Sequence, residues 1–168
     1  MRAKYQGDPY SRAPWDEIIP GLFMGGHFYR ASSGDVVPAV VADEFDLVIS
    51  LYRLVGHGPA TGIADHVREI PDSALTAAQL AEVCELAEMA AAAVRDGQKV
   101  LVRCHSGFNR SGLVVVQALG HLGHDVDDAI FLVRYHRSKW ALNNDLFVDY
   151  LRTGLDVAGL LTSLTVPD

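Results

Sequence analysis

Short apolar runs alternate with longer helical patterns along most of this chain, and that alternation restricts the fold more than any other feature. The runs typical of buried or alternating strands cover residues 22–26, 46–52, 66–70 and 99–103. The helical patterns cover residues 76–97, 110–120, 125–136 and 144–155. Strands that alternate with helices predict an α/β fold, with a mostly parallel central sheet of four or five strands and helices on both faces.

Capping residues mark the ends of these helical patterns. Thr76 and Gln79 have capping-box spacing at the start of the longest pattern, and Gly97 stands where that helix should end. Asp125 and Asn144 are N-cap candidates for two later helices. The helix boundaries are therefore expected near these five residues.

The length of 168 residues fits one domain, because domains commonly hold about 100–200 residues. Residues 1–14 are polar with two prolines and are expected to form an N-terminal arm, which leaves residues 15–168 as a single folded domain. No apolar run follows the basic residues at the start, and the most apolar stretch, residues 113–122, is too short to span a bilayer. We expect a cytoplasmic protein with no membrane contact.

The charge balance and the cysteine count exclude several classes of function. The 14 Lys and Arg against 21 Asp and Glu give a formal net charge of -7, which argues against a nucleic-acid partner or an anionic membrane surface. Two cysteines make neither a disulfide scaffold nor a four-cysteine zinc site. His121 and His124 are too few to indicate a metal site, so we expect no metal; the oligomeric state stays open.

The segment between the strand at 99–103 and the helix at 110–120 carries the chemistry. Five residues separate Cys104 from Arg110, with Gly107 among them and Ser111 directly after Arg110. Ligands of α/β domains bind at the carboxyl ends of such strands. A loop of this length can direct successive backbone N–H groups at a tetrahedral anion, and the following helix N-terminus adds positive potential.

Each residue type in this loop suits phosphate chemistry. The same dipoles favour a thiolate, so Cys104 is expected to be nucleophilic. Arg110 offers a planar fork to two phosphate oxygens, which lysine does not match. Gly107 lets the backbone pass close to the anion. Ser111 can donate a hydrogen bond to the sulfur and make it a better leaving group.

The pattern Cys-x-x-Gly-x-x-Arg-Ser resembles the signature of the cysteine-based protein phosphatases, in their compact dual-specificity and tyrosine-phosphatase branch. Residues 15–26 are similar to the opening strand segment of that family, and residues 144–151 resemble its last helix. The similarity covers residues 13–155. It implies the single-domain dual-specificity phosphatase fold and hydrolysis of phosphomonoesters through a phosphocysteine, with no cofactor. The implied substrates are a phosphorylated protein, on phosphotyrosine and also phosphoserine or phosphothreonine, or a small phosphomonoester.

The resemblance also implies roles for individual residues. Cys104 corresponds to the nucleophile, and Asp72, which lies 32 residues before it, to the general acid, with Asp65 as a weaker alternative. Ser111 corresponds to the residue that assists release of the thiolate, and Asn144 to one that steadies the loop. The residues implied to bind the phosphate are His105, Ser106, Gly107, Phe108, Asn109 and Arg110.

The sequence departs from the family where Arg103 replaces the usual histidine before the cysteine. Arg103 is therefore expected either to lower efficiency or to support the thiolate through its charge. Because of this departure, one alternative function is that of a catalytically weak phosphate-binding module. An RNA 5′-triphosphatase is a further alternative, because Gly-Phe-Asn-Arg-Ser-Gly resembles the loop of that group; Asp72 and the acidic surface argue against it. The remaining alternative function is that of a sulfur-transferring rhodanese.

The second cysteine, Cys84, lies near the apolar face of the helix at 76–97. We interpret it as a core residue. The alternative is a thiol that forms a protective disulfide with Cys104.

Overall fold

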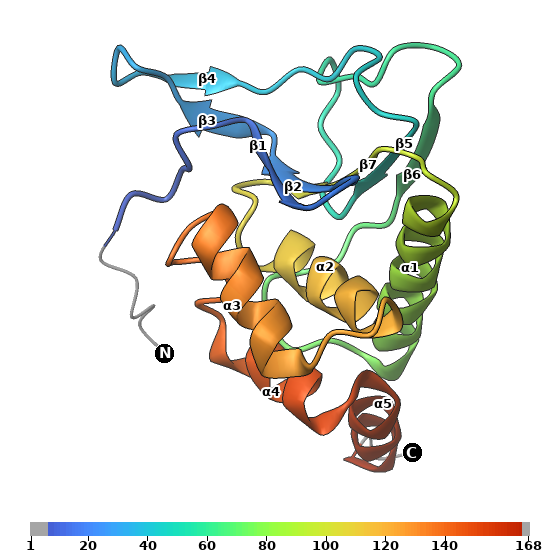
Figure 1. Ribbon diagram of the computed structural model, residues 1–168. Coiled ribbons are helices and arrows are strands. Elements are labelled where there is room, and N and C mark those ends of the chain that lie inside the picture. The colour runs from blue at the N-terminus through green and yellow to red at the C-terminus, as the bar shows by residue number, and fades with distance from the viewer. Residues whose placement is uncertain (1–6, 166–168) are drawn as a thin grey trace.

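A twisted five-stranded sheet forms the centre of the computed structural model, which describes residues 7–165 (Figure 1). Its strands are β1 (Trp15–Ile19), β2 (Leu22–Gly26), β5 (Leu47–Ser50), β6 (Ala64–Val67) and β7 (Val100–Cys104). The strand order is β1-β2-β7-β5-β6, and only the β1–β2 pair is antiparallel. The predicted mostly parallel sheet is therefore confirmed.

The central strand β7 is buried along its whole length and divides the interior into two layers. Val100, Val102 and Cys104 belong to the core between the sheet and the helices. Leu101 lies on the opposite face with a smaller apolar cluster, and strand alternation puts Arg103 on that face as well. This alternation separates the two residues that end the strand, Arg103 and Cys104.

The described residues form five helices, α1 (Ala77–Arg95), α2 (Arg110–His121), α3 (Val126–His136), α4 (Asp145–Thr153) and α5 (Leu155–Thr165). Three of them (α1, α3 and α4) begin where the capping residues predict. Thr76 and Gln79 form the complete capping box of α1, and the side chains of Asp125 and Asn144 accept hydrogen bonds at the starts of α3 and α4. One helix was expected over residues 144–155; instead, Gly154 ends α4 with a φ of 95° and α5 begins at the next residue.

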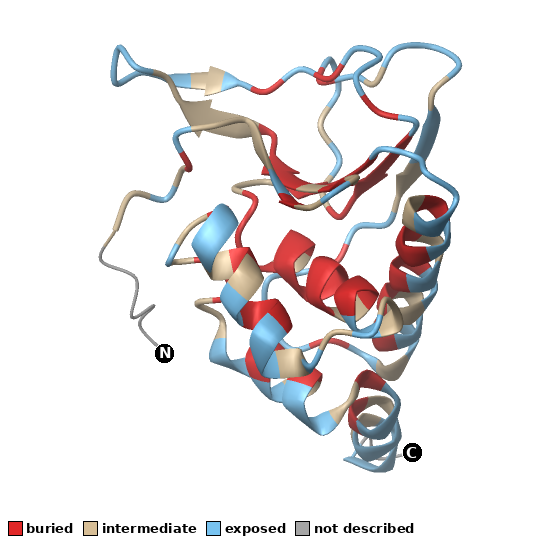
Figure 2. Ribbon diagram, viewed as in Figure 1, coloured by how far each residue is buried: buried red, intermediate tan, exposed pale blue. Residues whose placement is uncertain are grey.

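All five helices lie on one face of the sheet in Figure 1, and the buried residues lie between them and the strands in Figure 2. The sequence led us to expect helices on both faces. The other face is covered instead by the segments around residues 39–63, whose Val41, Phe45 and Ile63 pack with Val48 and Leu101 of the sheet. Residues 56–62 hold three glycines and a proline, and these residue types disfavour a helix.

Two strands, β3 (Phe28–Arg30) and β4 (Val36–Pro38), do not stand out in the sequence, and β1 was expected only through the family resemblance. β1 pairs with β2, and the short strands β3 and β4 form a separate two-stranded sheet. β6 begins two residues before the expected start at 66 and ends at Val67 rather than at 70. Within residues 7–165, no helix combines the length and the apolar character that a membrane crossing needs.

Candidate active site

Residues 105–110 link β7 to α2, and hydrogen bonds from the surrounding protein orient their peptide planes. The carbonyl of His105 accepts from His27 N at 2.9 Å, and that of Phe108 accepts from Leu142 N at 3.0 Å. The carbonyls of residues 106 and 107 accept hydrogen bonds from side-chain donors, and the carbonyl of residue 109 accepts one from a backbone N–H of α2. Because the C=O and the N–H of a trans peptide point in opposite directions, the N–H groups of residues 106–110 turn toward the inside of the loop.

Gly107 allows the loop to curve at this point. It has a φ of 76°, which side chains rarely adopt, and a Cβ would lie 2.5 Å from both the Gly25 backbone and Arg137 Nη2. From the sequence, the expected reason for a glycine at this position is the close approach of an anion to the backbone. The structure adds a second reason, because the protein itself fills the space that a side chain would need.

Cys104 lies buried at the base of this loop, beside a pocket of about 180 Å³. Its Sγ is 3.3 Å from Ser111 Oγ in the first turn of α2. Cys104, Ser106, Phe108, Asn109 and Arg110 line the pocket. The structure thus brings together the cysteine and four of the six residues that the resemblance implied would bind phosphate.

The Arg110 side chain is held by two contacts. Its Nη1 donates to the carbonyl of Ile70 at 3.4 Å, and its guanidinium carbon lies 5.3 Å from the centre of the Tyr52 ring. Its Nε is buried and has no hydrogen-bond partner among the described residues. Donor groups of Arg110 therefore remain for an anion beside Cys104.

Asp72 also lines this pocket, although it lies on a segment far from the loop in sequence. Asn109 Nδ2 donates to its Oδ2 at 3.0 Å, and Asn144 Nδ2 donates to its Oδ1 at 2.7 Å. Asp65, the alternative acid, lies on β6 and lines a different cavity. Geometry therefore favours Asp72 over Asp65 as the carboxyl group beside the loop.

Asn144 joins the segment of Asp72 to the loop. Its backbone N–H donates to Asn109 Oδ1 at 3.0 Å, and its side-chain oxygen accepts from Leu146 N at 3.1 Å as the N-cap of α4. The resemblance implied that Asn144 steadies the loop, and its contact with Asn109 agrees with that role. The additional bond from Asn144 to Asp72 is a feature that the sequence did not indicate.

Arg103 does not line the pocket. Its Nε donates to Ser50 Oγ at 2.9 Å, and its two terminal nitrogens donate to the carbonyls of His57 at 2.9 Å and Gly58 at 2.7 Å. Burial lowers its pKa, and the nearby charge of Asp65 opposes that shift. The arginine that replaces the usual histidine thus holds the loop around residues 57 and 58, on the face of the sheet away from the helices.

Sequence reasoning missed Arg137, at the end of α3. The residue is buried, its Nη1 pairs with Asp16 at 2.8 Å, and its Nε and Nη2 donate to the carbonyls of Gly107 and Ser106. Burial lowers its pKa, whereas Asp16 and the nearby Cys104 oppose the shift. A basic residue in the last turn of a helix usually faces solvent, so the sequence carries no signal for this role.

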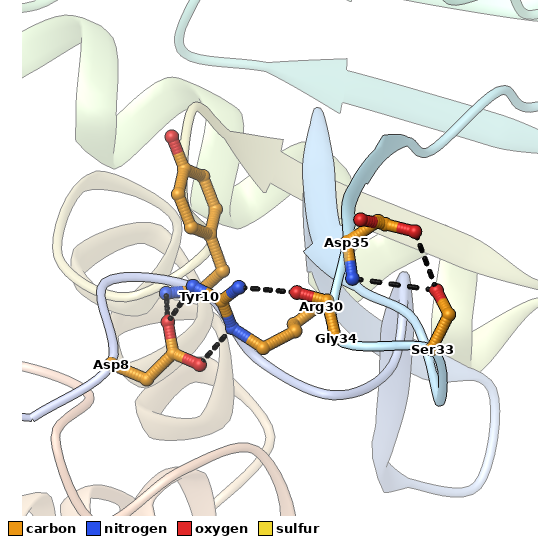
Figure 3. Close-up of polar contacts among 6 residues, drawn as sticks. All are labelled: Asp8, Tyr10, Arg30, Ser33, Gly34 and Asp35. Atoms are coloured by element: carbon orange, nitrogen blue, oxygen red, sulfur yellow. Dashed lines mark hydrogen bonds and ion pairs between the residues drawn. The ribbon is translucent and has the colours of Figure 1, made fainter.

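The described part of the N-terminal arm, residues 7–14, lies across the edge of the pocket, which Pro9 helps to line. Figure 3 shows its anchor, where Arg30 Nε and Nη2 donate to the two carboxylate oxygens of Asp8. This pairing lowers the pKa of Asp8. Tyr10 contacts the ring of His105 with centroids 6.2 Å apart. Residues 1–6 of the predicted arm lie outside the described residues.

The remaining candidates lie apart from the pocket. Cys84 Sγ is 3.9 Å from Asp156 Oδ1 on α5; burial and acidic neighbours raise its pKa, and both cysteines are free thiols. His121 lies at the end of α2 and His124 just after it. No group of three or more metal-ligating side chains occurs among residues 7–165.

His27, which holds the loop through its backbone, gives a testable pH dependence. Its Nε2 donates to the Tyr52 carbonyl at 2.9 Å, and burial, together with the charge of Arg103, lowers its pKa to about 4. The unfolded chain binds this proton near pH 6.5, so the free energy of unfolding should fall by about 3 kcal/mol between pH 7 and pH 4. Urea unfolding should show that the free energy of unfolding of the His27→Gln variant falls less between pH 7 and pH 4 than that of the wild type. For the variant at the exposed His136, His136→Gln, it should fall as much as for the wild type. Equal losses in all three proteins would contradict this assignment.

Comparison with solved structures supports the same reading of the fold. Human DUSP28 matches with a TM-score of 0.65 and 26% identity, over 89% of this chain and 97% of that one. A mouse putative dual specificity phosphatase matches with a TM-score of 0.58 and 21% identity, over 95% and 97%. The human tyrosine phosphatase-like serine/threonine/tyrosine-interacting protein matches with a TM-score of 0.56 and 22% identity, over 82% and 95%. No family model and no curated protein matches the sequence.

The fold and the pocket point to one family. The matched structures cover most of the chain, and the Cys104–Arg110 loop stands at the end of the central strand with Asp72 opposite. In fold and in signature loop, the chain is similar to the cysteine-based phosphatases of the dual-specificity type.

Proposed function

We propose that the protein is a metal-independent phosphatase that hydrolyses phosphomonoesters through a phosphocysteine formed on Cys104. The observation that carries this proposal is the pocket in which Cys104, Arg110 and Asp72 meet. One nucleophile, one cation with free donor groups and one carboxyl group are what two-step phosphoryl transfer requires.

In the first step the Cys104 thiolate attacks phosphorus. The inward N–H groups of residues 106–110 and the Arg110 guanidinium hold the three other phosphate oxygens as the transition state forms. The bond between phosphorus and the ester oxygen breaks, and protonated Asp72 gives its proton to that oxygen. The alcohol or phenol leaves, and the phosphoryl group stays on Sγ.

In the second step water attacks the phosphocysteine, and the Asp72 carboxylate takes a proton from that water. The S–P bond breaks and inorganic phosphate is released. Ser111 Oγ, 3.3 Å from Sγ, donates a hydrogen bond to the departing thiolate. Asp72 ends protonated, which is the form that the next first step uses.

Asp72→Asn gives a test of the acid role that depends on the leaving group. The amide cannot donate a carboxyl proton, so kcat for an alkyl phosphate should fall about 10²–10⁴-fold. A phosphate ester with a highly acidic phenol should lose far less, because that phenol leaves without a proton. Steady-state rates on a series of aryl and alkyl phosphates measure the difference. Asp65→Asn is the matched control, and a loss that is independent of the leaving group would contradict the role.

We further propose phosphotyrosine as the preferred substrate group. Four rings gather beside the loop: His105 lies 5.1 Å from Tyr52, 5.3 Å from Phe28 and 6.2 Å from Tyr10 between centroids. An aromatic surface of this kind can pack against the phenyl ring of a bound phosphotyrosine. The loop itself contains no lysine, which phosphoinositide phosphatases tend to carry there.

The proposed function is tested by rates on matched phosphopeptides in the presence of EDTA. We expect turnover that EDTA does not reduce, with a higher kcat/KM for phosphotyrosine than for phosphoserine or phosphothreonine in the same peptide. Triphosphate RNA should be a poor substrate. Loss of turnover on EDTA treatment would contradict the mechanism, and equal rates on all three peptides would contradict the phosphotyrosine preference.

A second candidate function is a phosphate-binding module with little turnover. It is favoured by Arg103 in the place of the usual histidine and by the similarity to an interacting protein of tyrosine phosphatase-like structure. The same experiment separates the two functions, because a module would bind the phosphotyrosine peptide and release no phosphate.

A further inference from the structure

A second cavity of about 380 Å³ lies on the face of the sheet that loops cover, away from the helices. Its lining comes from Ser50, from the segment 52–59, from β6 and from Arg103. None of its lining residues lines the pocket of Cys104. A volume of this size is typical of sites for small molecules.

The floor of this cavity contains a buried positive charge. Arg103 is only 2% exposed, and its three hydrogen bonds all go to uncharged acceptors. It forms no ion pair with any described residue; Asp65 attracts it from beyond ion-pair distance. A guanidinium has five N–H donors, so two remain available. Buried charges in proteins are normally paired, because desolvation is costly.

A second buried polar group lies in the same lining. His27 is 1% exposed, its Nε2 is occupied by the Tyr52 carbonyl, and its Nδ1 has no partner among the described residues. Buried polar atoms of this kind are uncommon and often indicate an absent partner. Among the described residues, one buried charge of this cavity thus lacks an oppositely charged partner, and one buried ring nitrogen lacks any hydrogen-bond partner.

The remaining lining limits the chemistry of a ligand. Leu54, Val55, Pro59 and Val67 offer apolar surface. The charged residues of the lining are Arg103, the exposed Arg53 and Asp65, so its formal charge with His27 neutral is +1, which one singly charged anion balances. A carboxylate carries a single charge and fits the planar fork of arginine.

We propose that this cavity is a second ligand site, which binds a small organic carboxylate. The carboxylate accepts from the free N–H groups of Arg103, and its apolar body packs along Leu54, Val55 and Val67. A hydroxyl or amino group on the ligand can donate to His27 Nδ1. The site is distinct from the proposed catalytic pocket, because the two cavities share no lining residue, although Tyr52 of its lining also contacts Arg110.

Titration of the wild-type protein with benzoate, followed by amide chemical shifts, tests the site. We expect saturable shifts in residues 52–59 and 64–67. Arg103→Gln should weaken the affinity at least about tenfold, because it removes a charge-assisted pair. Shifts confined to residues 105–110 would place the anion in the catalytic loop and overturn the proposal, as would the absence of saturable shifts.

Asp65→Asn provides a second variant that does not depend on a buried residue. Asp65 is exposed, so its replacement is expected to leave the fold intact. Removing its repulsion should tighten benzoate binding about two- to fivefold. An affinity that is unchanged or weaker in Asp65→Asn would contradict the assignment, even if Arg103→Gln failed to fold.

Discussion

Replacing Cys104 with serine is expected to reduce the turnover of para-nitrophenyl phosphate by on the order of 10⁴-fold or more. A serine hydroxyl is not ionised near neutral pH, so the inward N–H groups and Arg110 no longer have an anionic nucleophile to stabilise. The change of one atom leaves the pocket almost the same size. Steady-state rates of the two proteins, with folding checked by circular dichroism, measure the effect.

Two controls make this result specific. Cys84→Ser should keep wild-type activity, because Cys84 lies against α5 and away from the pocket. Cys104→Ser should still bind the phosphotyrosine peptide, since the loop and Arg110 are unchanged. Substantial turnover by Cys104→Ser would show that another group attacks phosphorus.

Replacing Arg110 with lysine should lower kcat by about 10³-fold, although the charge is kept. The guanidinium has a buried Nε without a hydrogen-bond partner in residues 7–165, and it is oriented by Ile70 and the Tyr52 ring. A lysine ammonium cannot bridge two phosphate oxygens in the fork geometry that the transition state needs. Arg53→Lys is the matched control, because Arg53 is exposed and lines the other cavity.

Whether the Arg110→Lys substitution changes kcat or KM shows what Arg110 does. A fall in kcat with a modest change in KM indicates that Arg110 acts mainly on the transition state. A rise in KM alone would mean that it binds substrate and transition state equally. That outcome would contradict the role proposed here.

The position of the Cys104–Arg110 loop between a strand and a helix could be predicted from sequence because its geometry is local. Five residues separate Cys104 from Arg110, and a strand end and a helix start fix the two ends of the loop. The caps of α1, α3 and α4 were predictable for the same reason, since each depends on residues within one helical turn. Asp72 needed the family resemblance, because its approach to the loop depends on Asn109 and Asn144.

The parts that could not be predicted depend on contacts between distant segments. Arg103 and Cys104 are neighbours in sequence, yet they point to opposite faces of the sheet, and the carbonyls that hold Arg103 come from residues 57 and 58. Arg137 reaches Ser106 and Gly107 from the end of α3. No periodic pattern in the sequence indicates where either of these arginine side chains lies. The loop-covered face was missed because a packed loop has no sequence pattern of its own.

Direct detection of the phosphocysteine tests whether Cys104 is the group that attacks phosphorus. Asp72→Asn should accumulate the intermediate, because no carboxylate remains to activate water for the second step. Acid quenching of this variant during turnover of para-nitrophenyl phosphate, followed by mass spectrometry of the peptide that contains Cys104, should show a phosphoryl group on that cysteine. Turnover with no phosphoryl group on Cys104, or with one on His105 instead, would contradict the mechanism.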